Sequence, residues 1–370
     1  MRPKENFRLG GFDKPLFFTT LILLLVGFIM VFSASALPAA EKYPHPFYFL
    51  VQQITGAVVG LGMMAALIYL KPAIYLESKV VYGLLALTLL LLSLCFIMPP
   101  INETNRWVIV LGLRFQPSEL AKLSLILFLA NYLEKQRERL NEAKSLLPCL
   151  GVIGLVVLLI LREPDLGTSV LFLFISFLIL FIGGVKIRFL GAIAGLVLAL
   201  FIVYFQQLPQ DDYRRQRWQA FRDQTSFQVL QSKLAVGSGG WLGVGLGEST
   251  QKLYFLPCAH TDFIYAIIGE EFGLMGTLSV LALYLLLFWR GLKVARHATS
   301  LGQKLTAYGL TLFLCSQALL NISIVLALGP TKGVPLPFIS YGRSALVCNL
   351  VAIGLLLNIS QRKALNGFSK

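Results

Sequence analysis

Three carboxylates stand where a glycine-rich polar stretch passes into an apolar pattern of helical length. Asp262, Glu270 and Glu271 all lie between Gly237 and Gly276, in GSGGWLGVGLGESTQKLYFLPCAHTDFIYAIIGEEFGLMG. If this pattern spans a membrane, an ionisable group near the bilayer centre costs about 2.5 to 3.5 kcal/mol on insertion scales, so it is kept mainly where it has a task. The stretch is therefore a candidate functional site.

Asp262 is the candidate for acid–base chemistry. We expect it in the first turn of a helix, with His260 or Thr261 at or before the N-cap. The helix dipole there favours the ionised carboxylate, while partial burial favours the neutral acid. A carboxyl group under these opposed influences suits a general base. Simple capping of the helix would also explain an aspartate at this position.

Glu270 and Glu271 follow Asp262 by eight and nine residues. Along a straight helix, this spacing places them about 12 Å deeper. The acid and base of a two-carboxylate hydrolase must flank one bond within about 5 to 9.5 Å, so neither glutamate can pair with Asp262 in that way. We expect both to hold helices together through polar contacts inside the bundle.

A second charged group opens another apolar run, in QPSELAKL. Glu119 and Lys122 are spaced i, i+3 and share a helix face, where an ion pair makes a buried charge tolerable. Ser118 fits the N-cap and Pro117 fits the first helical position, so the sequence leaves the helix start open between them.

Basic residues gather in segments that we expect on one side of the membrane. The stretch QDDYRRQRWQAFRDQ interleaves arginines with aromatic residues, which fits an amphipathic helix at the membrane surface. Its arginines could equally bind a pyrophosphate bidentately. The candidate rim residues are Lys122, Arg162, Lys332 and the arginines of this stretch, Arg214 and Arg215 among them, and Arg106 and Trp107 lie in a loop on the same side. Such a rim, with Asp262 in its midst, suits an anionic head group on a lipid.

The amino-acid composition indicates that these residues belong to a membrane protein. Of 370 residues, 56% are hydrophobic and only 14% are charged, and the mean hydropathy is +0.75. A soluble globular protein has about a quarter of its residues charged, so this class is excluded. Each membrane span needs about 20 apolar residues. We expect ten spans, at 15–36, 48–70, 78–98, 118–133, 147–161, 167–185, 189–208, 262–289, 305–328 and 337–361.

These spans define an all-α polytopic membrane protein with one membrane domain, 15–361. A long loop, at about 209–261, separates the seventh span from the eighth, and short tails, 1–14 and 362–370, flank the domain. No linker or low-complexity segment divides it.

The formal net charge of +14 raises the question of nucleic acid binding. The basic residues, however, lie in short loops beside the spans, where they set orientation. One side collects Arg2, Lys4, Arg8, Lys14, Lys135, Arg137, Arg139, Lys144, Lys186, Arg188, Arg290, Lys293, Arg296, Lys304, Arg362 and Lys363. We therefore expect both termini in the cytoplasm, the long loop outside, and no nucleic acid partner.

The cysteines form no CxxC pair, and four of the five lie in or beside apolar runs. We expect them to be small buried hydrophobic residues, with neither a metal cluster nor a disulfide framework. The glycines between 239 and 247 match neither a dinucleotide fingerprint nor a P-loop.

The motifs, taken together, resemble the SEDS family (shape, elongation, division and sporulation), with its FtsW and RodA branches. NRWV, QPSELAKL, EPDLGTS, GVGLGESTQK, LPCAHTDFIYAIIGEE and PTKGVPLPFISYG occur in the family's order over almost the whole chain. STQKLYFLPCAHTDFIYAIIGEE and NISIVLALGPTKGVPLPFISYG are more similar to the FtsW branch than to the RodA branch.

The resemblance implies a ten-span enzyme of the bacterial inner membrane that polymerises lipid II into peptidoglycan strands at the division septum. It implies that Asp262 is the catalytic residue of an HTDF motif, that Glu119 and Lys122 are the family's intramembrane charged pair, and that Arg106 and Trp107 are its RW motif. Two further supporting candidates, His260 and Ser340, lie within matched motifs. The implied partners are a class B penicillin-binding protein, which is a transpeptidase, and other division proteins.

The chain departs from the family pattern at two places. Cys258 stands where the family usually has Glu, and 340–345 reads SYGRSA where the family usually reads SYGGSS. Neither departure touches Asp262, so the expected activity stands, while partner contacts and rate are left open.

The expected mechanism uses Asp262 as the base that takes a proton from the acceptor sugar hydroxyl, while that oxygen displaces undecaprenyl pyrophosphate from the donor with inversion. General base catalysis contributes about 10² to 10⁴ to a rate. Loop arginines, Lys332 or a divalent cation (Mg or Mn) would stabilise the pyrophosphate, although no metal motif is recognisable. The alternatives are a lipid II flippase, an elongation polymerase of the RodA type, and a scaffold for division proteins.

Overall fold

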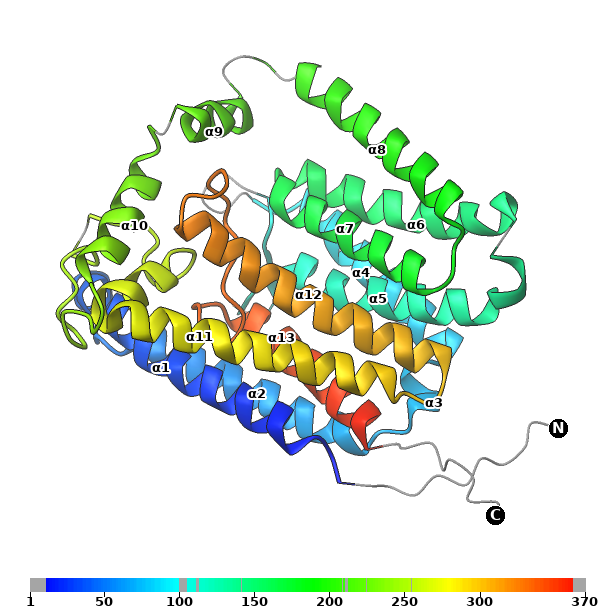
Figure 1. Cartoon of the computed structure of the whole chain (residues 1–370), viewed down its shortest axis with the longest axis horizontal. Helices are drawn as coiled ribbons and strands as arrows, with labels where there is room; N and C mark the ends of the chain where they lie inside the picture. The colour runs from blue at the N-terminus through cyan, green and yellow to red at the C-terminus, as the bar shows by residue number, and fades with distance from the viewer. Residues whose placement is uncertain are drawn as a thin grey trace.

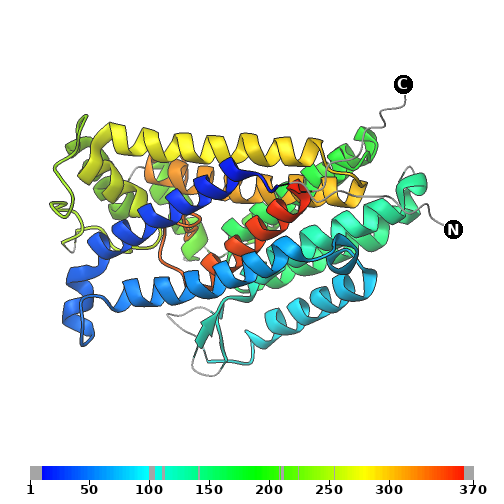
Figure 2. The same ribbon diagram turned by 90° about the horizontal axis from the view of Figure 1, so that it is seen from below.

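The computed structural model describes residues 11–99, 105–110, 113–140, 142–207, 209, 212–223, 225–253 and 255–361. Most of this chain is helical, and long helices run side by side in a bundle (Figures 1 and 2). The long helices are α1 (Lys14–Lys42), α2 (Tyr48–Tyr69), α4 (Ser78–Leu94), α5 (Pro117–Lys135), α6 (Ala143–Arg162), α7 (Leu166–Ile182), α8 (Ile187–Gln207), α11 (Ile264–Arg296), α12 (Leu301–Val325) and α13 (Arg343–Ser360).

Each apolar run of the sequence coincides with one of these helices. Among the described helices, seven are long and apolar enough to cross a membrane, namely α1, α2, α6, α8, α11, α12 and α13. Two more, α4 and α7, are apolar but shorter. α5 is buried almost all round, from Pro117 to Leu133, which is expected of a helix that other helices enclose.

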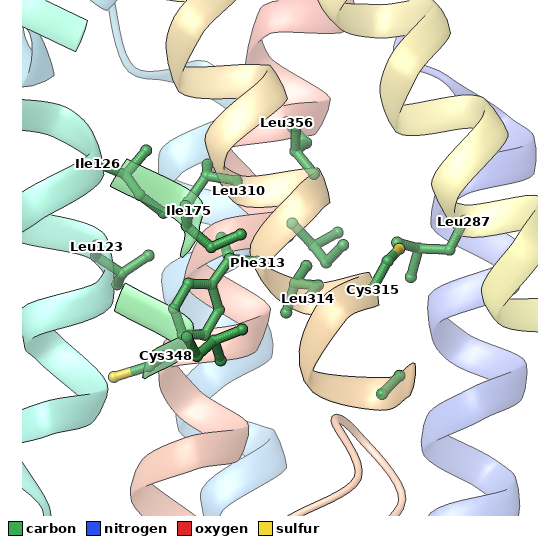
Figure 3. Packing of buried hydrophobic residues seen from close by; sticks show 14 of the residues in the cluster. Leu123, Ile126, Ile175, Leu287, Leu310, Phe313, Leu314, Cys315, Cys348 and Leu356 are labelled. Atoms are coloured by element: carbon green, nitrogen blue, oxygen red, sulfur yellow. The ribbon is translucent and has the colours of Figure 1, made fainter. Parts of the chain in front are cut away.

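The centre of the bundle is formed by α5, α7, α12 and α13. Figure 3 shows Phe313 of α12 among Leu123 and Ile126 of α5 and Ile175 of α7. The ring of Phe313 also meets Phe172 edge to face, at 5.8 Å between centroids. This packing holds α12 firmly against α5 and α7, which matters below because α12 supports the site.

The two ends of the bundle differ. At one end α1 begins and α13 ends, joined by a 3.0 Å hydrogen bond from the Asp13 amide to Ser360 Oγ. The other end carries α10 (Phe227–Ser238) and the glycine-rich loop that follows it (Figure 1). Between α8 and α10, α9 (Tyr213–Arg222) is the helix expected from the arginine and aromatic pattern.

Several boundaries differ from the expected spans. The last helix begins at Arg343 and not near 337, because Pro335 and Pro337 precede it in an extended and turn segment. The first helix continues to Lys42 through Pro38. Four elements were not expected from the sequence, namely α3 (Pro72–Tyr75), the 3-10 turn Arg137–Arg139, the helix α10, and the hairpin of β1 (Val108–Val110) and β2 (Leu113–Phe115).

The span expected at 262–289 is not one continuous helix, although the break lies beyond Glu270 and Glu271. α11 breaks at Gly273, whose φ of 63° and ψ of −158° no helix contains. The loop 239–245 fits into the break: the Val244 amide donates to the Glu270 carbonyl at 2.9 Å, and the Leu274 amide donates to the Gly240 carbonyl at 2.9 Å. The loop therefore supplies the partners that the broken helix lacks.

Gly243 provides a test of this contact. A Cβ there would lie 2.1 Å from the Glu271 carbonyl oxygen, and its φ of 81° disfavours any other residue. We expect Gly243→Ala to destabilise the protein by about 1 to 3 kcal/mol, measured as a fall in melting temperature in detergent. Gly237→Ala is the matched control, because a Cβ at that position meets nothing within 4 Å. Equal melting temperatures for the two variants would contradict the account.

Candidate functional site

Asp262 lies in the turn before α11, outside the helix itself. The N-cap of α11 is Phe263 and makes no side-chain capping bond. The expectation that Asp262 sits in the first helical turn is therefore wrong, whereas His260 and Thr261 lie before the N-cap, as expected. The turn is closed locally, because the amides of Thr261 and Phe263 both donate to the Cys258 carbonyl, at 3.0 and 3.3 Å. The backbone of Asp262 is thus held by a tight turn, and its carboxylate does not cap α11.

A cavity of about 270 Å³ opens beside this turn. Segments from five parts of the chain line it: Arg106; 164–167 with Val170; Phe201; Arg217 with Trp218; and 330–333. These segments belong to the region where the ends of α7, α8 and α9 face the loop before α13 (Figure 1). A Cβ on Gly333 would lie 3.3 Å from Asp262 Oδ2, which places the carboxylate next to a lining residue.

Arg106 joins the cavity wall to the turn before α7. Its Nε donates to the Glu163 carbonyl at 2.9 Å and its Nη2 to the Pro164 carbonyl at 2.5 Å. Its Nη1 is 3.6 Å from Asp165 Oδ2. Arg106 therefore fixes 163–165 while it contributes positive charge to the cavity.

Two further cations reach the same space. Arg217 Nη1 lies 3.5 Å from the Thr331 carbonyl, which connects α9 to the loop before α13. Lys332 is half-buried, and burial lowers the pKa of its amine while the Asp165 carboxylate opposes this change. A Cβ on Gly167 would come within 3.0 Å of Lys332 Cδ, so the glycine makes room for the lysine side chain.

Asp165 is the acidic member of the cavity lining. It caps α7, because its side chain accepts from the Thr168 amide at 3.1 Å and from Thr168 Oγ1 at 2.9 Å. It also acts on Asp262: burial first, and then the Asp165 carboxylate, raise the pKa of Asp262 to about 7, while Arg217 and Arg106 oppose the rise. A carboxyl group with this pKa can take up or release a proton near neutrality.

His260 and Ser340 support the turn from the other side. The His260 ring packs on Phe49 and Tyr341, with centroids 4.7 and 5.8 Å away, and burial, with Lys42 nearby, lowers its pKa to about 4. Ser340 Oγ donates to the Thr261 carbonyl at 2.5 Å. Neither lines the cavity, so both act on the turn that carries Asp262 and not on the cavity itself.

The expected rim is only partly correct. Lys122 is buried away from the cavity, where its Nζ lies 2.7 Å from Glu119 Oε2 and 2.9 Å from Gln317 Oε1. The i, i+3 ion pair is thereby confirmed, and Pro117 takes the first helical position, with Gln116 at the N-cap. Arg162 is exposed at the end of α6 and does not line the cavity. The rim placement of Lys122 and Arg162 is therefore wrong.

The loop arginines divide in a similar way. Arg217 and Trp218 line the cavity, whereas Trp107 and Arg215 do not. Arg214 belongs to α9, but its side chain falls outside the described part of the structure. Arg217 and Trp218 are neighbours in the chain and stand about 100° apart around α9, so the helical period did not single out Arg217 among the arginines of this segment.

Glu270 and Glu271 bind the loop between α10 and α11 as well as the bundle. Glu270 Oε1 accepts from the Thr250 amide and hydroxyl, both at 2.9 Å. Glu271 Oε1 forms a buried ion pair with Lys252 Nζ at 2.7 Å and accepts from Ser33 Oγ of α1 at 2.6 Å. The interhelical contact with α1 agrees with expectation, and the lysine partner in the loop was missed.

The donors for a metal ion are few. Among the described residues, no group of three or more His, Cys, Asp or Glu side chains gathers in a metal-binding arrangement. Asp165 and Asp262 are the two carboxylates that influence each other beside the cavity, and carboxylate oxygens are the ligands that hard divalent cations prefer.

Fold and site together define a helical, membrane-spanning protein with a cationic cavity at one end of its bundle and the protonatable carboxylate of Asp262 beside that cavity. Residues 14–365 match the family model that is named for FtsW, RodA and SpoVE and described as cell cycle protein. The chain belongs to this family, which confirms the resemblance found in the sequence.

Three similar proteins extend the match. The chain is 38% identical to the probable peptidoglycan glycosyltransferase FtsW of Geobacter sulfurreducens, covering 95% of each chain. A solved structure titled as structural coordination of polymerization and crosslinking by a peptidoglycan synthase complex has a chain with a TM-score of 0.77 and 29% identity, covering 94% of this chain and 97% of that one. A variant of the Thermus thermophilus rod shape determining protein RodA has a TM-score of 0.70 and 26% identity, with coverage of 94% and 97%.

The raised pKa of Asp262 predicts a dependence of stability on pH. The folded chain binds more protons than the unfolded chain between the usual aspartate pKa and about 7, so this group's contribution to stability falls as pH rises through that window. We expect Asp262→Asn to raise the melting temperature relative to wild type at about pH 8 and to do so much less at about pH 5. Asp223→Asn, at an exposed side chain paired with Arg222, is the control. The same difference at both pH values would contradict the assignment.

Proposed function

We propose that this protein is a peptidoglycan glycosyltransferase that polymerises lipid II at the division septum. The observation that carries the proposal is the placement of Asp262, whose pKa is raised to about 7, next to a cavity that three cationic side chains line or approach. A lipid-linked diphosphate sugar needs both features, namely a base for the incoming hydroxyl and positive charge for the leaving group. Similarity to the named FtsW protein over nearly the whole chain supports the same reaction.

In the proposed reaction, Asp262 accepts the proton of the acceptor sugar hydroxyl. The hydroxyl oxygen forms a bond to the anomeric carbon of the donor chain, and the bond from that carbon to the undecaprenyl diphosphate breaks, with inversion. Arg217, Lys332 and Arg106 stabilise the charge that develops on the departing diphosphate, because they stand on the walls of the cavity. If a divalent cation takes part, Asp165 and Asp262 would hold it, and it would neutralise phosphate charge.

The apolar part of the cavity suits the lipid. Leu166, Val170 and Phe201 line it beside the charged residues, and Phe201 belongs to α8, a helix whose side chains are largely exposed. A ligand with a charged head and an apolar tail would therefore meet matching surfaces in one cavity. A soluble sugar nucleotide has no apolar tail that would contact this apolar wall.

The topology follows from this proposal. Ten spans within 15–361, with 209–261 on the outer side of the inner membrane and the tails 1–14 and 362–370 in the cytoplasm, would give the cavity access to lipid II that has already crossed the membrane. The expected partner is a class B penicillin-binding protein, since a similar chain is part of a complex that coordinates polymerization and crosslinking. Other division proteins are expected at the septum.

Polymerisation in vitro tests the function. We expect the purified protein, with its transpeptidase partner, to convert labelled lipid II into glycan strands, and we expect Asp262→Asn to lower the rate by about 10² to 10⁴ because the base is lost. Strands made equally well by the variant would contradict the role of Asp262. Absence of strands from an intact wild-type complex, together with lipid II crossing vesicle membranes, would favour a flippase. Normal growth of cells with only Asp262→Asn would favour a scaffold.

The neighbours of Asp262 predict opposite shifts in the pH–rate profile. Asp165 raises the pKa of Asp262 and Arg217 lowers it, so removing each charge should move the acid limb in opposite directions. We expect Asp165→Asn, which retains an N-cap for α7, to move the limb to lower pH, and Arg217→Gln to move it to higher pH. The measurement is kcat/KM for lipid II polymerisation across about pH 5 to 9. Shifts of the same sign would show that Asp262 does not set the limb.

A further inference from the structure

One buried amide joins the two segments that meet at the site. Asn321 Nδ2 on α12 donates to the Asp262 carbonyl at 2.7 Å and to the Val334 carbonyl, also at 2.7 Å. Asn321 is 1% exposed. Both hydrogens of its amide are therefore committed, one to the turn that carries the proposed base and one to the loop that carries Lys332.

The same helix face holds the loop a second time. Gln317, one turn earlier on α12, donates from Nε2 to the Pro335 carbonyl at 2.9 Å. Its Oε1 accepts from Lys122 Nζ at 2.9 Å, and this lysine is paired with Glu119. The intramembrane ion pair thus ends on an amide that supports the loop 330–336, and i, i+4 spacing puts Gln317 and Asn321 on one face.

We propose that Asn321 is a positioning residue for Asp262, a role that rests on the proposed function. Its amide fixes the separation between the Asp262 turn and the loop 330–336, and so sets where the carboxylate lies relative to Gly333 and Lys332. Gln317 holds the same loop through the Pro335 carbonyl, and the Glu119–Lys122 pair holds Gln317 through the hydrogen bond from Lys122. The ion pair acts on the reaction through this loop and does not touch the substrate.

The position of the Asp262 carboxylate is sensitive to small movements of the loop 330–336. A Cβ on Gly333 would approach Asp262 Oδ2 to 3.3 Å, so the loop and the carboxylate are already close to contact. Loss of the amide leaves two buried carbonyls without their donor. A displacement of about 1 Å at a reacting group can cost about 10²-fold in rate.

The chain contains its own reporter for this placement. Cys258 belongs to the same turn as Asp262 and is exposed, whereas the other four cysteines are buried. The rate at which a maleimide labels Cys258 therefore reports on how firmly the turn is held, and it does not depend on enzymatic activity.

A matched control exists at the other end of the bundle. Asn358 on α13 is also 1% exposed, and its Nδ2 donates to the carbonyls of Leu67, Ile68 and Leu70. Asn358→Asp thus makes the same chemical change as Asn321→Asp at an equally buried amide, far from the cavity.

The experiment compares wild type, Asn321→Asp, Asn321→Ala and Asn358→Asp in the full-length protein with its transpeptidase partner. We expect both Asn321 variants to lower kcat for lipid II polymerisation by about 10²-fold, with little change in KM, and to speed maleimide labelling of Cys258 several-fold. We expect Asn358→Asp to change neither kcat nor labelling, although it lowers the melting temperature. Asn321→Ala introduces no charge, so it provides the comparison if Asn321→Asp does not fold.

Unchanged kcat and unchanged labelling in a folded Asn321 variant would overturn the proposal, and so would equal losses in the Asn321 and Asn358 variants. A wild-type complex that makes no strands would contradict the proposed function. The labelling rates would then still decide whether Asn321 holds the turn.

Discussion

The structure depends on one constraint. Backbone polar groups and charged side chains that are buried inside the bundle, away from water, must find partners within the chain. Irregular backbone at membrane depth is tolerated only where its polar groups are bound. Each irregular segment near the site obeys this rule. The loop 239–245 bonds to both sides of the break in α11, the Asp262 turn bonds to Asn321, and the loop before α13 bonds to Gln317 and Ser340.

The same constraint produces the chemistry. Asp262 lies in a setting that favours its neutral form, next to cations that favour the charged form, and its pKa of about 7 is the outcome. In contrast, the charges of Glu119, Lys122, Lys252 and Glu271 are paired within the protein. These four charges are therefore held in pairs, whereas Asp262, like the buried Glu163 whose pKa burial raises to about 8, keeps a carboxyl group that can exchange a proton near neutrality.

Much of the fold could be predicted from the sequence, because long apolar runs have few alternatives in a membrane. The Glu119–Lys122 pair could be predicted too, since its spacing is local. The break at Gly273 could not, because it depends on a loop thirty residues earlier that supplies the missing hydrogen bonds. A glycine inside an apolar run is usually a packing residue, so Gly273 carried no distinct signal.

The site was partly predictable for the same reason. Asp262, Arg106 and Lys332 were identified from motifs, and the structure brings them to one cavity or its edge. Lys122 and Arg162 were misplaced, because burial and helix rotation follow from tertiary packing. Asn321 and Gln317 were missed, although polar residues at i, i+4 in an apolar run are a signal that an intramembrane contact is being made.

In the proposed reaction, the cavity beside Asp262 receives the diphosphate of a lipid-linked sugar. A cryo-electron microscopy structure of the full complex with a non-reacting lipid II analogue tests it most directly. We expect the diphosphate in contact with Arg217 and Lys332, with a sugar hydroxyl or the anomeric carbon beside the Asp262 carboxylate. A diphosphate bound elsewhere, for example along a path through the bundle near Glu119 and Lys122, would contradict it.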